Sequence, residues 1–185
     1  METIDTPPGI QNRNAFRTSV RPSEIKISSF WIHEPNTFFK EVPVKKGQYV
    51  LALNEGVTLL NISAGGALIR IAAPPEIGML RLLALPPPPG ENKAGQHGQT
   101  HYRDISIGMR ADLRKDVREI LVACRIVRAV MLRTTEKQVV YELATRFNAW
   151  GNLVGTTVQW HKLRDDGNVP PLMAWIVQRQ LSNAR

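Results

Sequence analysis

The sequence has a single cysteine and no long apolar segment. Cys124 is the only cysteine among 185 residues, so no disulfide can form within the chain, and its apolar neighbours predict a buried, inert thiol. No apolar run approaches the roughly 20 residues that a membrane-spanning helix needs. The first ten residues are polar and contain Pro7 and Pro8, unlike a secretory signal peptide. We therefore expect a soluble, reduced, cytoplasmic protein without membrane insertion.

The short motifs of common catalytic sites are also missing. The chain has no G-x-S-x-G elbow, no Walker loop and no H-E-x-x-H pair. His97 and His101 share one polar segment, but no cysteine accompanies them, which makes a metal site a weak interpretation. We expect no enzymatic activity, no metal and no resident cofactor.

Acidic residues are outnumbered by basic ones. Lys and Arg total 24 against 16 Asp and Glu, which gives a formal net charge of +8. This balance favours an anionic partner, such as a nucleic acid, a phosphorylated small molecule or an acidic protein surface, although many basic proteins have no such partner. The cations are scattered and interrupted by acids, as in residues 115–119, which disfavours a basic stripe for nucleic acid.

Short β-type runs separated by turn residues follow one another along most of the chain. The runs span residues 25–31, 48–53, 57–62, 67–71, 120–131 and 138–147, while 102–112 is ambiguous. Turns are predicted at residues 54–56, 65–66, 74–78 and 134–137. This pattern predicts an all-β fold, a small antiparallel barrel.

The remaining segments have other compositions. Residues 1–12 are predicted to be a flexible tail, 33–48 an insertion or extra hairpin, and 86–101 an exposed loop that begins with four prolines. Residues 170–181 place Leu172, Trp175, Ile176 and Arg179 at helical spacing, which predicts an amphipathic C-terminal helix packed on the barrel. We expect one domain over residues 13–182.

Two short motifs follow one another in the N-terminal half of the sequence. Arg13 and Arg17 form R-x-x-x-R before the first β run, and Asn61, Ser63 and Gly66 form N-x-S-x-x-G between two β runs. Together they resemble the paired signature of the PilZ domain family, which includes the C-terminal domain of flagellar-brake proteins. A second R-x-x-x-R pair, Arg17 and Arg21, is the less similar alternative.

The resemblance implies a fold, a ligand and a role. PilZ domains are six-stranded antiparallel barrels, usually with a terminal helix, that bind the bacterial second messenger cyclic di-GMP. It implies that Arg13, Arg17, Asn61, Ser63 and Gly66 bind this ligand, and that binding changes the conformation and signals to an unidentified protein partner. Control of motility, exopolysaccharide output or virulence would follow. The alternatives are a small β-barrel that binds nucleic acid and a ligand-blind adaptor that keeps the barrel.

The residue types suit this ligand, which presents two phosphates and two guanine bases. The planar arginine side chain can hold a phosphate through two parallel bonds and can also stack on a purine or pair with a guanine edge. Asn61 offers a donor and an acceptor to a base, and Ser63 adds a hydroxyl. Gly66 is expected to take a positive φ at the turn and to let a ligand approach the backbone. The competing interpretation is a plain hairpin turn in which Asn61 and Ser63 bond their own backbone.

Overall fold

The protein is an antiparallel β-sheet with little helix. The computed structural model describes residues 18–19, 24–35, 37, 39–63, 65–85, 102–113, 116–163, 172, 174–175 and 178. Within these ranges the strands are β1 (Thr18–Ser19), β2 (Ile25–His33), β3 (Tyr49–Leu53), β4 (Val57–Ser63), β5 (Gly66–Ala73), β6 (Asp104–Leu113), β7 (Asp116–Thr134), β8 (Val139–Val154) and β9 (Thr157–Lys162). The predicted all-β class is therefore confirmed.

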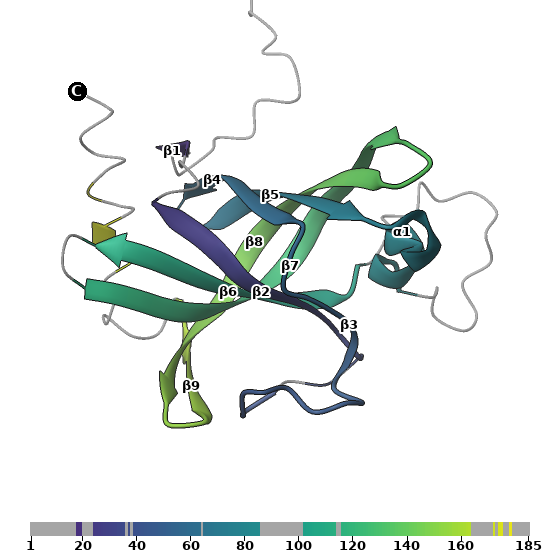
Figure 1. Ribbon diagram of the computed structural model, residues 1–185. Helices are drawn as coiled ribbons and strands as arrows, with labels where there is room; N and C mark the ends of the chain where they lie inside the picture. Colours follow the sequence, from purple (N-terminus) through teal and green to yellow (C-terminus); the bar gives the residue numbers. More distant parts are fainter. Residues whose placement is uncertain are drawn as a thin grey trace, which may run out of the picture.

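The strands form one sheet whose order is β1-β4-β5-β8-β7-β6-β2-β3, with β9 added to β8. Figure 1 shows the sheet curving strongly, and the β7–β8 hairpin projecting beyond its neighbours. The ladder path ends at β1 and β3, and no ladder joins these two strands in the described part of the chain. The prediction of a closed, six-stranded barrel is thus wrong: nine strands are described, and the sheet stays open between two short edge strands.

The main core lies on the concave side of the sheet. Alternate residues of the strands point into it, and its fully buried members include Phe30, Ile69, Ile107 and Leu143. A short 3-10 turn, Pro75–Ile77, leads into helix α1 (Met79–Leu83), where the sequence predicted only a turn. Met79 and Leu83 of this helix are fully buried in the same core, so α1 covers one end of it.

The predicted insertion at residues 33–48 packs against the opposite face of the sheet. Phe39 is fully buried there between Trp31 and Trp160, with ring centroids 5.4 and 5.8 Å from it. Trp160 Nε1 donates to the Phe39 carbonyl at 2.9 Å. This second apolar cluster (Trp31, Phe39, Leu121 and Val158) explains why β2 ends in a continuous buried run instead of alternating.

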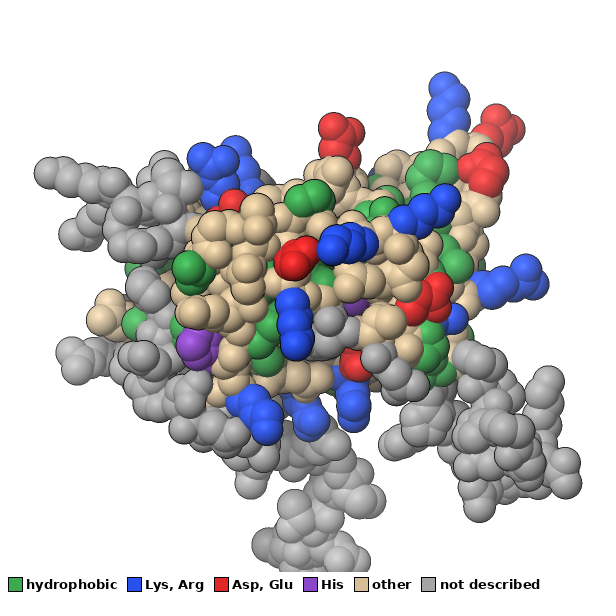
Figure 2. Space-filling model, turned by 90° about the horizontal axis from the view of Figure 1, so that it is seen from below, with side chains coloured by type: hydrophobic (Ala, Val, Ile, Leu, Met, Phe, Trp, Pro, Cys, Tyr) green, Lys and Arg blue, Asp and Glu red, His purple; other side chains and the backbone are tan. Residues whose placement is uncertain are grey.

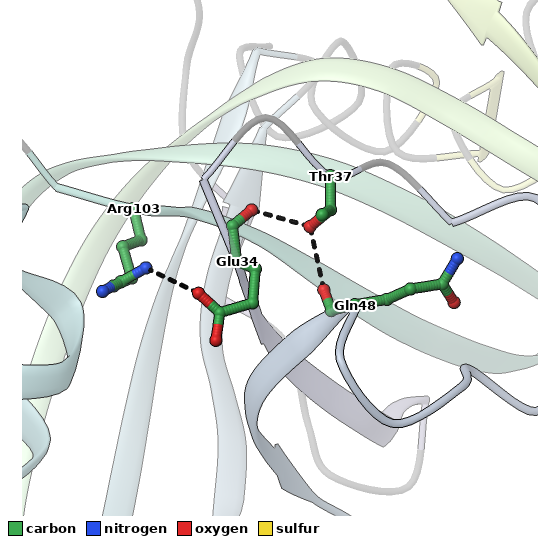
Figure 3. Close-up of polar contacts among 4 residues, drawn as sticks. All are labelled: Glu34, Thr37, Gln48 and Arg103. Atoms are coloured by element: carbon green, nitrogen blue, oxygen red, sulfur yellow. Dashed lines mark hydrogen bonds and ion pairs between the residues drawn. The ribbon is translucent and has the colours of Figure 1, made fainter.

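Polar contacts fasten the ends of the same segment, as Figure 3 shows. The Thr37 hydroxyl lies 2.6 Å from the Glu34 carbonyl and 3.0 Å from the Gln48 carbonyl. The Arg103 side chain, which comes from the start of β6, reaches the Glu34 carboxylate at 3.4 Å. These contacts hold the turn after β2 against the start of β3.

The single cysteine lies in the core. Cys124 is buried, as predicted, and burial raises the pKa of its thiol far above the usual range, which keeps it unreactive.

The C-terminal helix is not seen as an element; only Leu172, Ala174, Trp175 and Gln178 of that segment are described. The predicted tail at 1–12 and loop at 86–101 lie outside the described residues. No helix of the described chain is long and apolar enough to cross a membrane.

His33 is a buried titratable group at the junction of both apolar clusters. Its side chain stacks on Phe39, with 5.1 Å between ring centroids, and its Nε2 lies 2.7 Å from the Ser106 hydroxyl. Burial lowers the pKa of His33 below its usual value of 6.5, while a backbone hydrogen bond with Gln48 and the charge of Asp104 oppose this shift. Folding therefore favours the neutral form of His33.

This burial predicts acid sensitivity. Because the pKa is lower in the folded state, the unfolded chain binds more protons below pH 6.5, and stability falls there by up to about 1.4 kcal/mol per pH unit. Urea unfolding of the wild type between pH 7.5 and 5 measures this slope. His33→Gln should flatten it, because the variant lacks the buried imidazole. Equal slopes in the wild type and His33→Gln would contradict the prediction.

Candidate ligand-binding surface

The N-x-S-x-x-G motif forms the hairpin that joins β4 to β5. Ser63 pairs with Gly66 across the turn, and the Ser63 hydroxyl donates to the Gly66 carbonyl at 3.2 Å. Ser63 is buried, so its side chain serves the turn, as the plain hairpin interpretation predicted.

Gly66 has a role that the sequence did not predict. Its φ is not positive, so the left-handed backbone that a glycine permits at this turn is not adopted. A Cβ on Gly66 would instead overlap the carbonyl oxygen of Thr145 on β8. Glycine is needed here because β5 and β8 approach each other closely, whatever binds outside.

Asn61 is the member of the motif whose side chain is not used by the turn. It pairs with Leu68 of β5, on the outer face of the sheet. Its Oδ1 is buried and accepts no hydrogen bond from any described residue. A buried acceptor without a partner costs about 1–3 kcal/mol. A ligand that donates a hydrogen bond to this oxygen would remove that cost.

Strand β1 adds to β4 directly beside the motif. Thr18 pairs with Ile62, and Ser19 pairs with Asn61. Arg13 and Arg17 lie outside the described residues, but Thr18 is the residue that follows Arg17 in the sequence. The β1–β4 ladder therefore brings the chain position next to Arg17 to the strand that carries Asn61 and Ser63.

Three further arginines lie on the same outer face, and sequence inspection missed them as candidates. Gly66 pairs with Arg146 of β8, and Arg146 pairs with Arg125 of β7. One row along, Leu68 pairs with Ala144, and Ala144 with Arg128. Directly paired residues point to the same side of a sheet, and neighbouring strands are about 4.8 Å apart. Arg146 thus lies one strand from Gly66, and Arg125 and Arg128 lie one strand farther, on the same face.

These arginines are poorly neutralised. All three are exposed, and Arg128 and Arg146 form no ion pair with any described residue. Arg125 lies 3.9 Å from Asp104, at the limit of an ion pair between two exposed side chains. Such a pair contributes little, so the surface around Asn61 keeps a positive charge. We call the set Asn61, Arg125, Arg128 and Arg146 the outer-face site.

The face of the molecule drawn in Figure 2 has a different distribution of charge from the outer-face site. On this face, Lys and Arg side chains are spread apart and interspersed with Asp and Glu. Within the described ranges, no group of three or more His, Cys, Asp and Glu side chains could hold a metal ion. The outer-face site is therefore suited to an anion that also donates hydrogen bonds.

Compared with known proteins, the chain matches no family model, no curated protein and no solved structure.

Proposed function

We propose that this protein is a receptor for cyclic di-GMP, bound at the outer-face site with Arg13 and Arg17. The observation that carries the proposal is the pairing of β1 with β4. It brings Thr18, the residue after Arg17, to the strand that carries Asn61, although Arg17 and Asn61 are 44 positions apart in the sequence (61 − 17). The resemblance to PilZ domains supplies the identity of the ligand.

The chemistry of the site supports this class of ligand. The guanine base carries N–H donors, and one of them can satisfy the buried Oδ1 of Asn61. Each phosphate carries a negative charge, and Arg128 and Arg146 form no ion pair with a described residue. Arg13 and Arg17 then close over the ligand from the N-terminal side, and this ordering is the signal passed to a protein partner. Ordering costs roughly 1–2 kcal/mol per residue, which the phosphate contacts must exceed.

A titration of the protein with cyclic di-GMP tests the proposal. Calorimetry should show saturable binding, and the affinity of Asn61→Ala should be about three- to tenfold lower, because one hydrogen bond is lost. The melting temperature of free Asn61→Ala should not fall, since Oδ1 has no partner within the described protein.

Asn152→Ala is the matched control. Asn152 Oδ1 lies 3.0 Å from His161 Nε2 in the β8–β9 hairpin, so this variant should lose some stability and keep its affinity. The amides of Thr18 and Ser19 should also gain protection from hydrogen exchange when ligand is added. No heat of binding to the wild type, or an unchanged affinity in Asn61→Ala, would sink the proposal. Tighter binding to single-stranded nucleic acid would favour the nucleic-acid alternative.

A further inference from the structure

Half of strand β7 has an edge that no described strand pairs. β7 spans Asp116–Thr134, and its ladder with β6 runs from Asp116 to Arg125. From Ile126 to Thr134 its only ladder in the described chain is the one with β8. The other edge of these nine residues therefore presents backbone N–H and C=O groups that no described strand pairs. We call residues 126–134 the β7 edge.

The β7 edge is unusually apolar for an exposed strand. The exposed fractions of Val127, Met131 and Leu132 are 64%, 53% and 47%. Val127 and Leu132 are the extra residues of two bulges, which fall between Ile126 and Arg128 and between Met131 and Arg133. Natural edge strands are usually protected by charge, proline or short length. Here a long strand keeps apolar side chains in solvent, which is typical of a surface that another molecule covers.

The charged residues of this surface are basic. Arg128 and Arg133 are exposed and form no ion pair with any described residue. Beside the tip of the hairpin lies a shallow groove of about 390 Å³, which Arg133 shares with Leu132, Arg70, Thr58, Gln138 and Val140. Arg70 is held by Glu142 at 2.6 Å, whereas Arg133 forms no ion pair with a described residue. Among the described residues, the surface thus combines a strand edge without a ladder, apolar side chains and positive charge without an ion pair.

We propose that the β7 edge binds an extended acidic segment of another protein, which adds a strand to the sheet. The backbone ladder would supply affinity, while alternate apolar and acidic side chains of the segment would meet Met131 and Leu132, and Arg128 and Arg133. Arg128 belongs to both the β7 edge and the outer-face site, so the binding of the segment is measured without the ligand of that site.

Charge argues against the first of the two nearest competitors, and composition against the second. A second copy pairing antiparallel through the same edge would gather Arg128 and Arg133 of both copies in one short ladder, and like charges across a ladder are destabilising. Residues 86–101 of this chain carry four prolines, three glycines and Thr100 as their one β-branched residue, a composition that disfavours a strand. An acidic strand from another protein adds no positive charge to the ladder and can have a composition that favours a strand.

The test uses a labelled peptide of about eight residues that alternates Glu and Val, a usual strand length. Fluorescence anisotropy with the full chain should show binding. A peptide with Lys in place of Glu, and one with alternate peptide nitrogens methylated, should not bind. Arg133→Glu should weaken binding by roughly three- to tenfold at low salt. Lys26→Glu, at an exposed position of β2, is the matched control and should leave it unchanged.

Hydrogen exchange of the wild type with peptide keeps the test valid if a variant fails to fold. Alternate amides between Ile126 and Thr134 should gain protection, while those of β6 should not. Equal binding of the Lys or methylated peptide, or protection elsewhere, would overturn the proposal. Protection of the β7 edge that rises with protein concentration alone, together with a dimer in sedimentation, would overturn it in favour of a second copy.

Discussion

Replacing Arg13 and Arg17 together with alanine should abolish measurable binding of cyclic di-GMP, with a loss of affinity of about 100-fold or more. Each arginine is expected to make at least one charge-assisted hydrogen bond to the ligand, worth about 1.5–3 kcal/mol. Two such losses give roughly 3–6 kcal/mol, and each 1.4 kcal/mol is a tenfold change in affinity. Calorimetric titration of the double variant and the wild type measures the difference.

Arg21→Ala is the control for this experiment. Arg21 belongs to the alternative R-x-x-x-R pair with Arg17, so its loss removes the same charge from the same part of the chain. If the motif is Arg13 and Arg17, this variant should keep an affinity within about twofold of the wild type, since it loses a positive charge but no hydrogen bond to the ligand. An equal loss in Arg21→Ala would mean that net charge, not the motif, drives binding. The melting temperature of each free variant should be unchanged.

Gly66→Ala should destabilise the fold strongly, whether or not ligand binds. The added Cβ would overlap the backbone carbonyl oxygen of Thr145, and a backbone atom inside a ladder cannot move aside without breaking the pairing of β5 with β8. Overpacking of this kind costs roughly 2–4 kcal/mol. For a chain of this size the melting temperature should fall by about 5–15 °C.

The neighbouring glycine provides the comparison. A Cβ on Gly65 would meet nothing within 4 Å, and its backbone is not left-handed, so Gly65→Ala should change the free energy of unfolding by less than about 1 kcal/mol. Thermal unfolding followed by circular dichroism measures both variants. A small effect of Gly66→Ala would mean that the two strands can separate at the turn and that this glycine is present for the ligand instead.

The sequence predicts the strands well where the side chains alternate and the turn residues are clear. The turn at residues 134–137 lies where β7 ends and β8 begins, and the Thr135 amide donates to Gln138 at 2.8 Å. Strand β9 was not predicted, although the sequence has a glycine at position 155, whose φ in the structure is 64°, followed by the alternation of Val158 and Trp160. Closure of the sheet could not be predicted, because it depends on which strands pair across long separations, such as β2 with β6.

The residues of the candidate site also divide into those that a local motif predicts and those that only the pairing of distant strands brings together. Asn61, Ser63 and Gly66 are local in sequence, so a motif could identify them. Arg125 and Arg146 lie 59 and 80 positions beyond Gly66 (125 − 66 and 146 − 66) and meet it only through the register of three strands. A shift of one residue in that register would turn both arginines toward the core. No local pattern carries this information, which explains why these side chains were not singled out.

The small size of β1 bears on how quickly a ligand could leave. β1 contributes two paired residues at the outer edge of the sheet. Its separation from β4 is a local opening, which in proteins has a far lower free energy than global unfolding. Motions of such terminal segments take nanoseconds to microseconds. Ligand entry and exit at the outer-face site can therefore be governed by the opening of the short β1–β4 ladder alone. The fraction of receptor that is occupied can then follow a change in ligand concentration quickly, because no other part of the fold has to open.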